Sequence, residues 1–270
     1  MNQGLGFEIM PFEIAPEFEG ESYEGEFEYE GGFETEFGAP VRSRPAFKYV
    51  TDFSGPAVEC VRSLRRAGKT KAQALSLINA QIGVGITMLR KAATDLKRGS
   101  RTQTTKDLFL KIFRVRPEFV PTWLKPTASI KDRGDVVARR CTRVADLLAS
   151  GKIKFFCTIN VTNCPDCAGV GSAHACSSYG NDRVVCLGDA FWDDMKAGRT
   201  SSNLATLIHE PFHIYFGLYV TEHRSNAGKF GGINCILRFV FEANGRSAPG
   251  RVNQACTDMA VRQELEASWS

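Results

Sequence analysis

The chain has 270 residues, of which 43% are hydrophobic, and this is enough for one full-sized domain or two small ones. No run of about 18 apolar residues predicts a membrane span, and no basic segment followed by an apolar one predicts an ordinary secretory signal. We therefore expect no membrane partner, and either a cytoplasmic protein or one that reaches the outside of the cell by a non-classical route.

The charge is divided unevenly along the sequence. Residues 1–40 contain eleven Glu and no Asp, Lys or Arg, so they carry −11, whereas the other 230 residues carry +15. A basic surface can bind nucleic acid. Here, however, the Lys and Arg are scattered through amphipathic stretches rather than gathered in one run, and this argues against a nucleic-acid partner.

Residues 1–45 predict a disordered tail. Glu and Gly alternate there with eight Phe and Tyr residues. High like charge and frequent Gly oppose a packed core, and so many aromatic residues exceed what a merely solubilising segment needs. The tail could be a solvated leader, a docking or targeting segment, or a segment that folds back on the basic part of the chain and shields its cleft. We expect it to precede one folded domain over residues 46–270.

The first part of this domain has a helical pattern. Apolar residues recur every three or four positions from Leu75 to Leu96. They predict one long amphipathic helix that Thr70 caps and Gly99 ends. Shorter helical patterns follow over residues 106–113 and 132–150. Because nothing in these helices indicates catalysis, we expect them to support a site formed elsewhere.

The middle of the chain changes to a strand-like pattern. The runs 153–159 and 183–187 are rich in β-branched and aromatic residues and predict two strands, separated by a loop rich in Cys, Gly and Ser. A third long helix follows, with Ser202 or Asn203 as its cap and Gly217 at its end. The last fifty residues predict one further helix.

His209, Glu210 and His213 form an HExxH motif inside this third long helix. Two histidines four residues apart lie one turn above each other, so both imidazoles can reach one metal ion. Zinc suits them because it accepts nitrogen ligands near tetrahedral geometry and lowers the pKa of bound water toward neutrality. Glu210, next to the first histidine, can take that water's proton. The motif therefore predicts a zinc-dependent metallopeptidase with Glu210 as its general base.

A catalytic zinc site needs a third protein ligand. No aspartate follows the motif until Asp258. We favour His223, ten residues after His213, because imidazole is a preferred zinc ligand. The adjacent Glu222 is the alternative.

Pro211 lies inside the motif and inside the predicted helix. Proline lacks the N–H that would bond to the carbonyl of Leu207, which costs about 3 kcal/mol or a kink. We therefore expect either that the helix bends at the site or that metal binding offsets the strain.

The sequence contains nine cysteines, five of them between residues 157 and 186. Such density is typical of disulfide-bonded proteins in an oxidising compartment. Cys164 and Cys167 form a single CxxC unit, whereas zinc ribbons usually pair two. We therefore favour disulfides over a structural zinc in this loop. An odd count leaves at least one thiol unpaired in a monomer, and His174 in the same loop is interpreted as a polar loop residue.

The order of these motifs resembles the aspzincin family of zinc metallopeptidases, which includes deuterolysin and the lysine-specific metalloendopeptidases. The resemblance rests on Phe155 to Cys157, on Cys164 and Cys167, on a strand and turn from Arg183 to Trp192, and on the helical motif from Thr206 to His213. It implies a zincin-like fold and endopeptidase activity on protein or peptide substrates. It also implies that His209 and His213 bind zinc and that Glu210 is the general base.

The chain departs from the family pattern at two places. The family's Gly-Thr motif with its zinc-binding aspartate is absent, and Glu222 and His223 stand at about that spacing. The family often has a downstream Asn-Ala-Asp-x-Tyr motif, whose aspartate recognises the lysine side chain of the substrate in the lysine-specific members. Asn234, between Gly232 and Ile236, is the nearest match here. The resemblance therefore implies a substrate pocket at Asn234 but does not extend to lysine specificity.

Together these features predict an α+β, zincin-like metallopeptidase domain, mostly helical, with a small β-sheet beside the active-site helix. One alternative is a non-catalytic, zinc-stabilised binding or effector module with the acidic tail as a docking segment. The other is a cargo or docking protein whose function resides in residues 1–45. The composition of this tail is similar to leaders on bacterial proteins associated with contractile injection systems, so secretion or injection machinery is a candidate partner.

Overall fold

The computed structural model describes residues 48–50, 52–55, 57–120, 124–159, 164, 167, 174–178, 183–216 and 232–257. The chain divides into two units, Met1–Arg44 and Pro45–Ser270, and every described residue belongs to the second. The predicted acidic tail lies outside the described residues.

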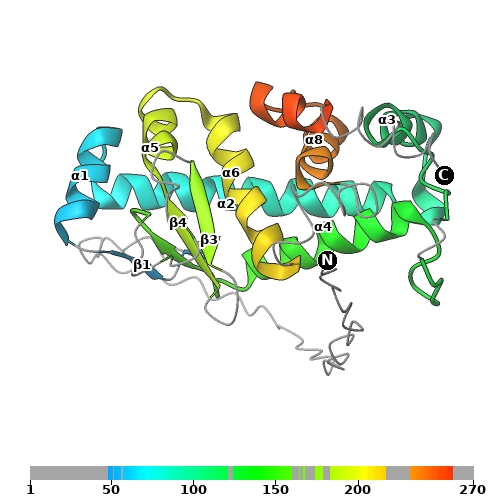
Figure 1. The fold of residues 1–270 in the computed structure, drawn as a ribbon, viewed down its shortest axis with the longest axis horizontal. Helices are drawn as coiled ribbons and strands as arrows, with labels where there is room; N and C mark the ends of the chain where they lie inside the picture. Colours follow the sequence, from blue (N-terminus) through cyan, green and yellow to red (C-terminus); the bar gives the residue numbers. More distant parts are fainter. Residues whose placement is uncertain are drawn as a thin grey trace, which may run out of the picture. The chain divides into compact units, whose positions relative to one another are not determined.

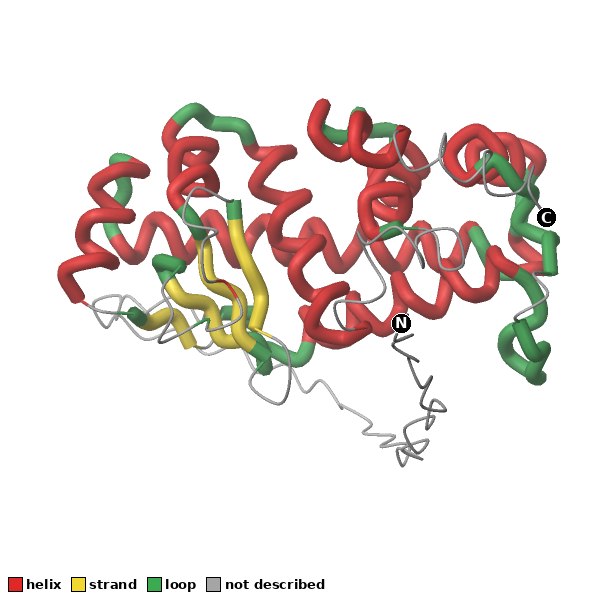
Figure 2. The backbone as a smooth tube through the Cα atoms, in the orientation of Figure 1, coloured by secondary structure: helices red, strands yellow, loops and turns green. Residues whose placement is uncertain are grey.

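Helices make up most of the described structure, and they accompany a small mixed sheet (Figures 1 and 2). The mostly helical α+β class predicted from the sequence is confirmed at this level. The helices are α1 (Ala57–Ala67), α2 (Lys71–Asp95), a short 3₁₀ helix (Arg98–Ser100), α3 (Gln103–Phe113), α4 (Arg133–Ala149), α5 (Asp189–Lys196), α6 (Thr200–Phe216) and α8 (Ile233–Ala243), and residues 250–257 are also helical.

The sheet has four strands in the order β1-β2-β4-β3. The strands are β1 (Asp52–Ser54), β2 (Lys154–Phe156), β3 (Ala175–Ser178) and β4 (Val184–Leu187). β1, β2 and β4 run parallel, whereas β3 is antiparallel to β4 with Cys176 opposite Cys186. All four residues of β4 are buried, which explains its unbroken apolar run.

Helix α2 forms the centre of the hydrophobic core. A capping box fixes its start: the Thr70 side chain accepts a hydrogen bond from the Gln73 backbone N–H at 3.2 Å, and the Gln73 side chain accepts one from the Thr70 backbone N–H at 2.9 Å. α2 then packs against α4, α6 and α8 (Figure 1). Within the described part of the chain it is the one helix long and apolar enough to cross a membrane. Its ten buried residues are typical of the core helix of a folded domain.

A glycine sets how closely α6 approaches α2. A Cβ atom at Gly85 would lie 3.0 Å from Cγ1 of Ile208 and 3.4 Å from Cδ1 of Leu204, both on α6. Ile208 is fully buried at this contact. A larger residue at position 85 would push α6 outward, so this glycine contributes to the position of the helix that carries the HExxH motif.

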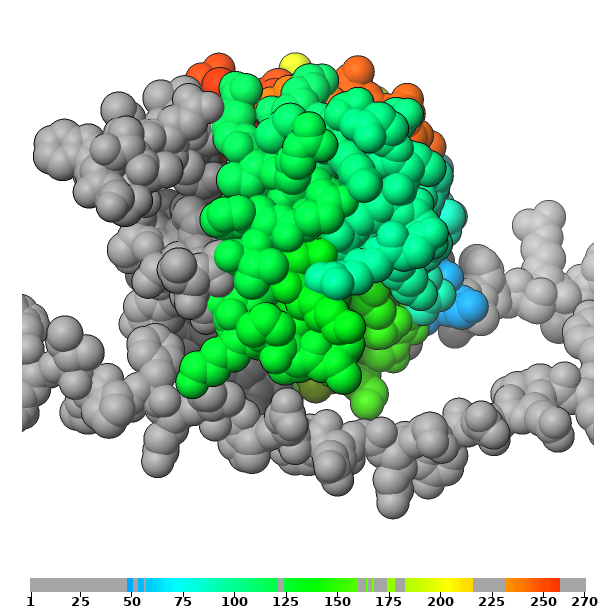
Figure 3. All heavy atoms as spheres, turned by 90° about the vertical axis from the view of Figure 1, so that its right-hand side faces the viewer, coloured from blue at the N-terminus to red at the C-terminus, as the bar shows by residue number. Residues whose placement is uncertain are grey.

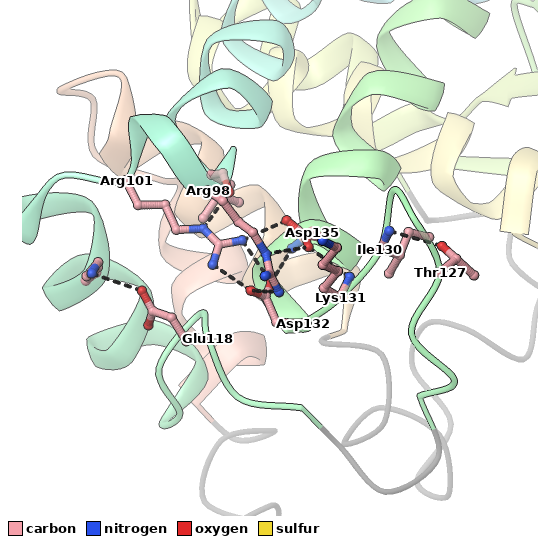
Figure 4. Close-up of polar contacts among 10 residues, drawn as sticks. Arg98, Arg101, Glu118, Thr127, Ile130, Lys131, Asp132 and Asp135 are labelled. Carbon is pink, nitrogen blue, oxygen red and sulfur yellow. Dashed lines mark hydrogen bonds and ion pairs between the residues drawn. The ribbon is translucent and has the colours of Figure 1, made fainter.

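A buried ion cluster ties the start of α4 to the segment after α2 (Figure 4). Asp132 caps α4 by accepting a hydrogen bond from the Asp135 backbone at 2.9 Å. Arg101 donates to both carboxylate oxygens of Asp132 at 2.8 Å, and Arg98 adds a bond at 2.9 Å. The side chains of Asp132 and Arg101 are each only 2% exposed. In the space-filling view of this end, the green residues of α4 pack directly against the teal end of α2 (Figure 3).

The charge state of Asp132 depends on this cluster. Burial alone would raise the pKa of its carboxyl group. Hydrogen bonds from Arg101 and from the Asp135 backbone, with the charges of Arg101 and Arg98, outweigh burial and lower that pKa below its usual value. The ionised carboxylate therefore stabilises the fold.

Asp132→Asn is expected to lower the free energy of unfolding at pH 7 by about 3 kcal/mol, because the buried Arg101 loses its two-oxygen partner and keeps, as an ion pair, only its single bond to Asp135 at 2.9 Å. Urea unfolding measures this change. Asp146→Asn is the matched control: its ion pair with Arg90 is more than half exposed on both sides, so the loss should stay below about 1 kcal/mol.

The same cluster predicts a pH dependence. Because the folded pKa of Asp132 is depressed, its contribution is fully present above the unfolded value of about 3.9 and is lost as pH falls through the folded pKa. Between neutral and acidic pH, the free energy of unfolding should fall less in Asp132→Asn than in the wild-type protein. An Asp132→Asn protein as stable as wild type at pH 7 would contradict the assignment.

Candidate metal site on helix α6

Helix α6 buries one side and keeps one polar stripe. Leu204, Leu207, Ile208 and Phe212 are buried in the core. Along another side of the helix, polar residues recur about every three or four positions: Ser202, Thr206, His209, Glu210 and His213. The helix continues through Pro211 to Phe216, so the proline does not end it.

The two histidines of the motif point toward each other. Their Nε2 atoms lie 2.9 Å apart, and their ring centroids are 4.8 Å apart at an interplanar angle of 55°. His213 is 8% exposed and His209 is half-buried. Two nitrogens that bind one zinc ion at about 2.0–2.1 Å cannot lie more than about 4.2 Å apart. The observed 2.9 Å is below this limit and about 0.4 Å shorter than the separation of about 3.3 Å in a tetrahedral site, so a small opening of the pair would let His209 and His213 share one zinc ion.

Glu210 is held beside this pair by strand β3. Its carboxylate is buried, with 7% of the residue exposed, and its Oε2 accepts a hydrogen bond of 3.0 Å from the hydroxyl of Ser177. Ser177 itself is 1% exposed. This bond fixes the orientation of the carboxylate and joins β3 to α6. Ser177 was not singled out from the sequence, where only its Ser-rich loop was visible.

Disulfides hold the strand that carries Ser177. Cys176, next to it, is bonded to Cys167, and Cys186 on the paired strand β4 is bonded to Cys164. The expected disulfides are therefore confirmed, and the CxxC residues bond outward rather than to each other. The other two bridges join Cys60 to Cys157 and Cys235 to Cys256.

The unpaired thiol expected from the odd count is Cys141 on α4. It is completely buried, and burial raises its pKa to about 12. This thiol is therefore protonated at neutral pH and acts as a small apolar side chain.

A second polar cluster surrounds Asp194, which is 3% exposed at the end of α5. Its carboxylate lies 3.1 Å from Nε2 of His174 and accepts a bond of 3.0 Å from Arg199 and another from Ser202. Burial and the charge of Arg251 lower the pKa of His174 despite the nearby Asp194. His174 is therefore neutral at pH 7, and its Nε2 is directed to Asp194 rather than to the histidine pair.

Arg251 places a positive charge on the same polar stripe. Its Nη2 donates to the carbonyl of Ser202 at 2.9 Å and to the hydroxyl of Thr206 at 2.5 Å. Thr206 lies one helical turn before Glu210, and Glu210 is close enough to act electrostatically on Arg251. Burial lowers the pKa of Arg251, and the carboxylates of Asp194 and Glu210 oppose that shift. Sequence reasoning missed Arg251 because it lies 45 residues from Thr206.

Of the remaining predicted site residues, the structure describes only Asn234. His223 and Glu222, the candidates for the third ligand, lie outside the described residues. Asn234 is half-buried in the first turn of α8, and among the described residues no hydrogen bond joins its side chain to the motif. Within this part of the chain no group of three His, Cys, Asp or Glu residues could hold a metal ion.

Comparisons of the chain with protein-family models, with curated proteins and with solved structures find no match. The chemistry of the site therefore rests on its own residues.

The Cys235–Cys256 bridge is expected to hold the 250–257 helix, and with it Arg251, against α8. The two half-cystines are 21 residues apart, so Cys235→Ala/Cys256→Ala should lower the free energy of unfolding by about 3 kcal/mol. Hydrogen exchange should rise within 250–257 and remain unchanged in β3.

The double variant Cys167→Ala/Cys176→Ala is the matched control, because it removes the bridge next to Ser177 and should loosen β3 instead. Unchanged exchange within 250–257 after loss of the Cys235–Cys256 bridge would show that packing alone positions Arg251.

Proposed function

We propose that this chain is a zinc-dependent metalloendopeptidase of zincin-like fold that hydrolyses peptide bonds. The observation that carries the proposal is a pair of imidazole nitrogens 2.9 Å apart with the buried carboxylate of Glu210 in the same helical turn. His209 and His213 would hold the zinc ion through Nε2. His223 is the favoured third ligand and Glu222 the alternative.

The donor set and its surroundings support zinc over harder cations. Neutral imidazole nitrogens suit zinc, whereas Mg²⁺ and Ca²⁺ prefer oxygen ligands. Both histidines lie on a helix whose opposite side is packed into the core, so the rings have little freedom to separate. When bound, zinc supplies Lewis acidity that polarises a carbonyl and lowers the pKa of water toward neutrality.

Glu210 supplies the base. Ser177 fixes one carboxylate oxygen by its 3.0 Å hydrogen bond, and this orients Glu210 on the same stripe as the histidine pair. In that position its carboxylate accepts the proton of the attacking water and returns it to the leaving amine. A positioned general base of this kind contributes about 100- to 10,000-fold to the rate.

The location of Glu210 also favours an extended peptide as the substrate. β3 is an edge strand, because β4 pairs with one side of it and no described strand pairs with the other. An extended peptide can add to such an edge through backbone hydrogen bonds. Since Ser177 of β3 contacts Glu210, a peptide bound there would pass beside the catalytic base.

Zinc content tests the metal assignment. Wild-type protein dialysed against zinc should retain one ion per chain, and His213→Ala should lose it because the site is left with two of its three protein ligands. His174→Ala is the matched control and should keep its zinc, since His174 bonds to Asp194. Equal zinc loss in both variants, measured by plasma mass spectrometry, would contradict the proposed ligands.

Glu210→Gln separates an enzyme from a zinc-stabilised binding module. The variant should keep its zinc and lose at least about 100-fold in kcat/KM on a labelled protein substrate, because Gln cannot accept the proton. Ser177→Ala should also keep its zinc and show a smaller loss in kcat. Zinc-loaded wild-type protein without proteolysis on a broad substrate panel, or an active Glu210→Gln protein, would overturn the proposed activity.

A further inference from the structure

A concave site lies where α4 and α6 end. It is a pocket of about 450 Å³, which is within the usual range of about 300–1,000 Å³ for ligand sites. Arg143 comes from α4, Lys152 follows that helix, Arg183 precedes β4, and Tyr215 lies in the last turn of α6. Four segments that are distant in the sequence therefore converge on one hollow.

The pocket carries an excess of positive charge. Arg143, Lys152 and Arg183 are exposed, and within the described residues no ion pair satisfies any of the three. Asp146 is the acidic residue among the described lining, and its carboxylate is 3.3 Å from Nη2 of Arg90. Three cations thus face a hollow whose one described acid already has a partner.

Helix dipoles explain only part of this arrangement. The carboxyl end of a helix carries about half a negative charge, so the ends of α4 and α6 together offset about one cation. Arg183 also adopts a left-handed backbone conformation with φ of 45°, which is uncommon for a non-glycine residue and costs about 1–2 kcal/mol. Arg183 directly precedes β4, so this conformation belongs to the connection from β3, whereas an added anionic ligand would account for the surplus of cations.

We propose that this pocket binds an acidic peptide segment, bearing an aromatic side chain, of a partner protein. Carboxylates of the segment pair with the three cations, and a backbone N–H group of the segment can donate to the second carboxylate oxygen of Asp146, since Arg90 occupies the first. The ring of Tyr215, 42% exposed, gives the aromatic side chain a surface to stack on.

A compact inorganic anion fits these features less well. It would use the cations alone, fill only part of the pocket volume and make no use of the exposed Tyr215 ring. The acceptor Asp146 would have no role toward it. Clusters of Arg residues are a recurring means by which proteins recognise acidic peptide motifs.

Peptide binding at this pocket requires neither zinc nor catalysis. Tyr215 lies two residues after His213 in α6, but on the helix it points well away from the histidine side chains. A protein without bound metal should therefore still bind the peptide. Loss of metal binding and loss of peptide binding can be measured separately.

Fluorescence anisotropy with the full chain tests the site. The probe is a labelled hexapeptide that alternates Glu with Phe or Tyr, and saturable binding that weakens with added salt is expected. Arg143→Gln/Lys152→Gln/Arg183→Gln should raise Kd about tenfold, as expected from the loss of three partly exposed charge contacts.

The matched control removes the same number of exposed cations elsewhere, with Arg62→Gln/Arg65→Gln/Lys131→Gln. Its Kd should stay within about twofold of wild type, since screened charges outside the pocket act weakly. Equal weakening in the two triple variants would mean that only the net charge attracts the probe, and it would overturn the proposal.

Two further variants test whether the pocket recognises the aromatic side chain of the peptide and whether binding is independent of the metal site. Tyr215→Ala should weaken binding of the aromatic probe but not of a Glu-Ser peptide of the same charge. His213→Ala should bind the probe as wild type does. Absence of saturable binding to wild type, loss of binding in His213→Ala, or tighter binding of single-stranded RNA at the same residues would each overturn the proposal.

Discussion

The burial of α6 is the constraint on which the site depends. Its apolar residues pack into the core, and Gly85 allows Ile208 to approach α2 within van der Waals contact. A helix buried in this way leaves a single stripe for polar groups, and the HExxH motif occupies it. The histidine nitrogens lie 2.9 Å apart because both side chains leave the helix from that one stripe. The core and the candidate metal site are therefore consequences of the same packing.

Disulfides and buried polar contacts complete the arrangement from both sides. Two bridges flank Ser177 on β3 and β4, and Ser177 in turn orients Glu210. A third bridge holds the 250–257 helix to α8, and this helix carries Arg251 to the same stripe of α6. A small four-stranded sheet with strands of three or four residues has little stability of its own, so covalent bridges are a physical means of keeping β3 in place.

The sequence predicted those elements whose pattern is local. The long helices α2, α4 and α6 were visible because apolar residues recur over several turns, and Thr70 and Asp132 cap two of them as typical capping residues do. β2 and β4 are equally short, but they lie in runs of β-branched and aromatic residues. β1 and β3 were missed because Asp52–Ser54 and Ala175–Ser178 consist mainly of small and polar residues. The turn expected before Trp192 is instead the first turn of α5.

The candidate site likewise combines contacts between residues close in the sequence with contacts between residues far apart in it. The histidine pair follows from a spacing of four residues, whereas Ser177 is 33 residues from Glu210. No sequence pattern connects residues so far apart, and the same holds for the Cys60–Cys157 bridge, with its separation of 97. The expected strands, helices and disulfides could be argued from one chain, but the partners of Glu210 and Asp194 required the fold.

X-ray absorption at the zinc edge of the zinc-loaded protein tests the central claim most directly. The account predicts a first shell of nitrogen and oxygen atoms at about 2.0–2.1 Å, including two imidazoles that give characteristic outer-shell scattering. It predicts no sulfur, because the disulfides occupy the cysteines of the β3 region. Sulfur ligands at about 2.3 Å, or a spectrum without imidazole scattering, would contradict a site built on His209 and His213.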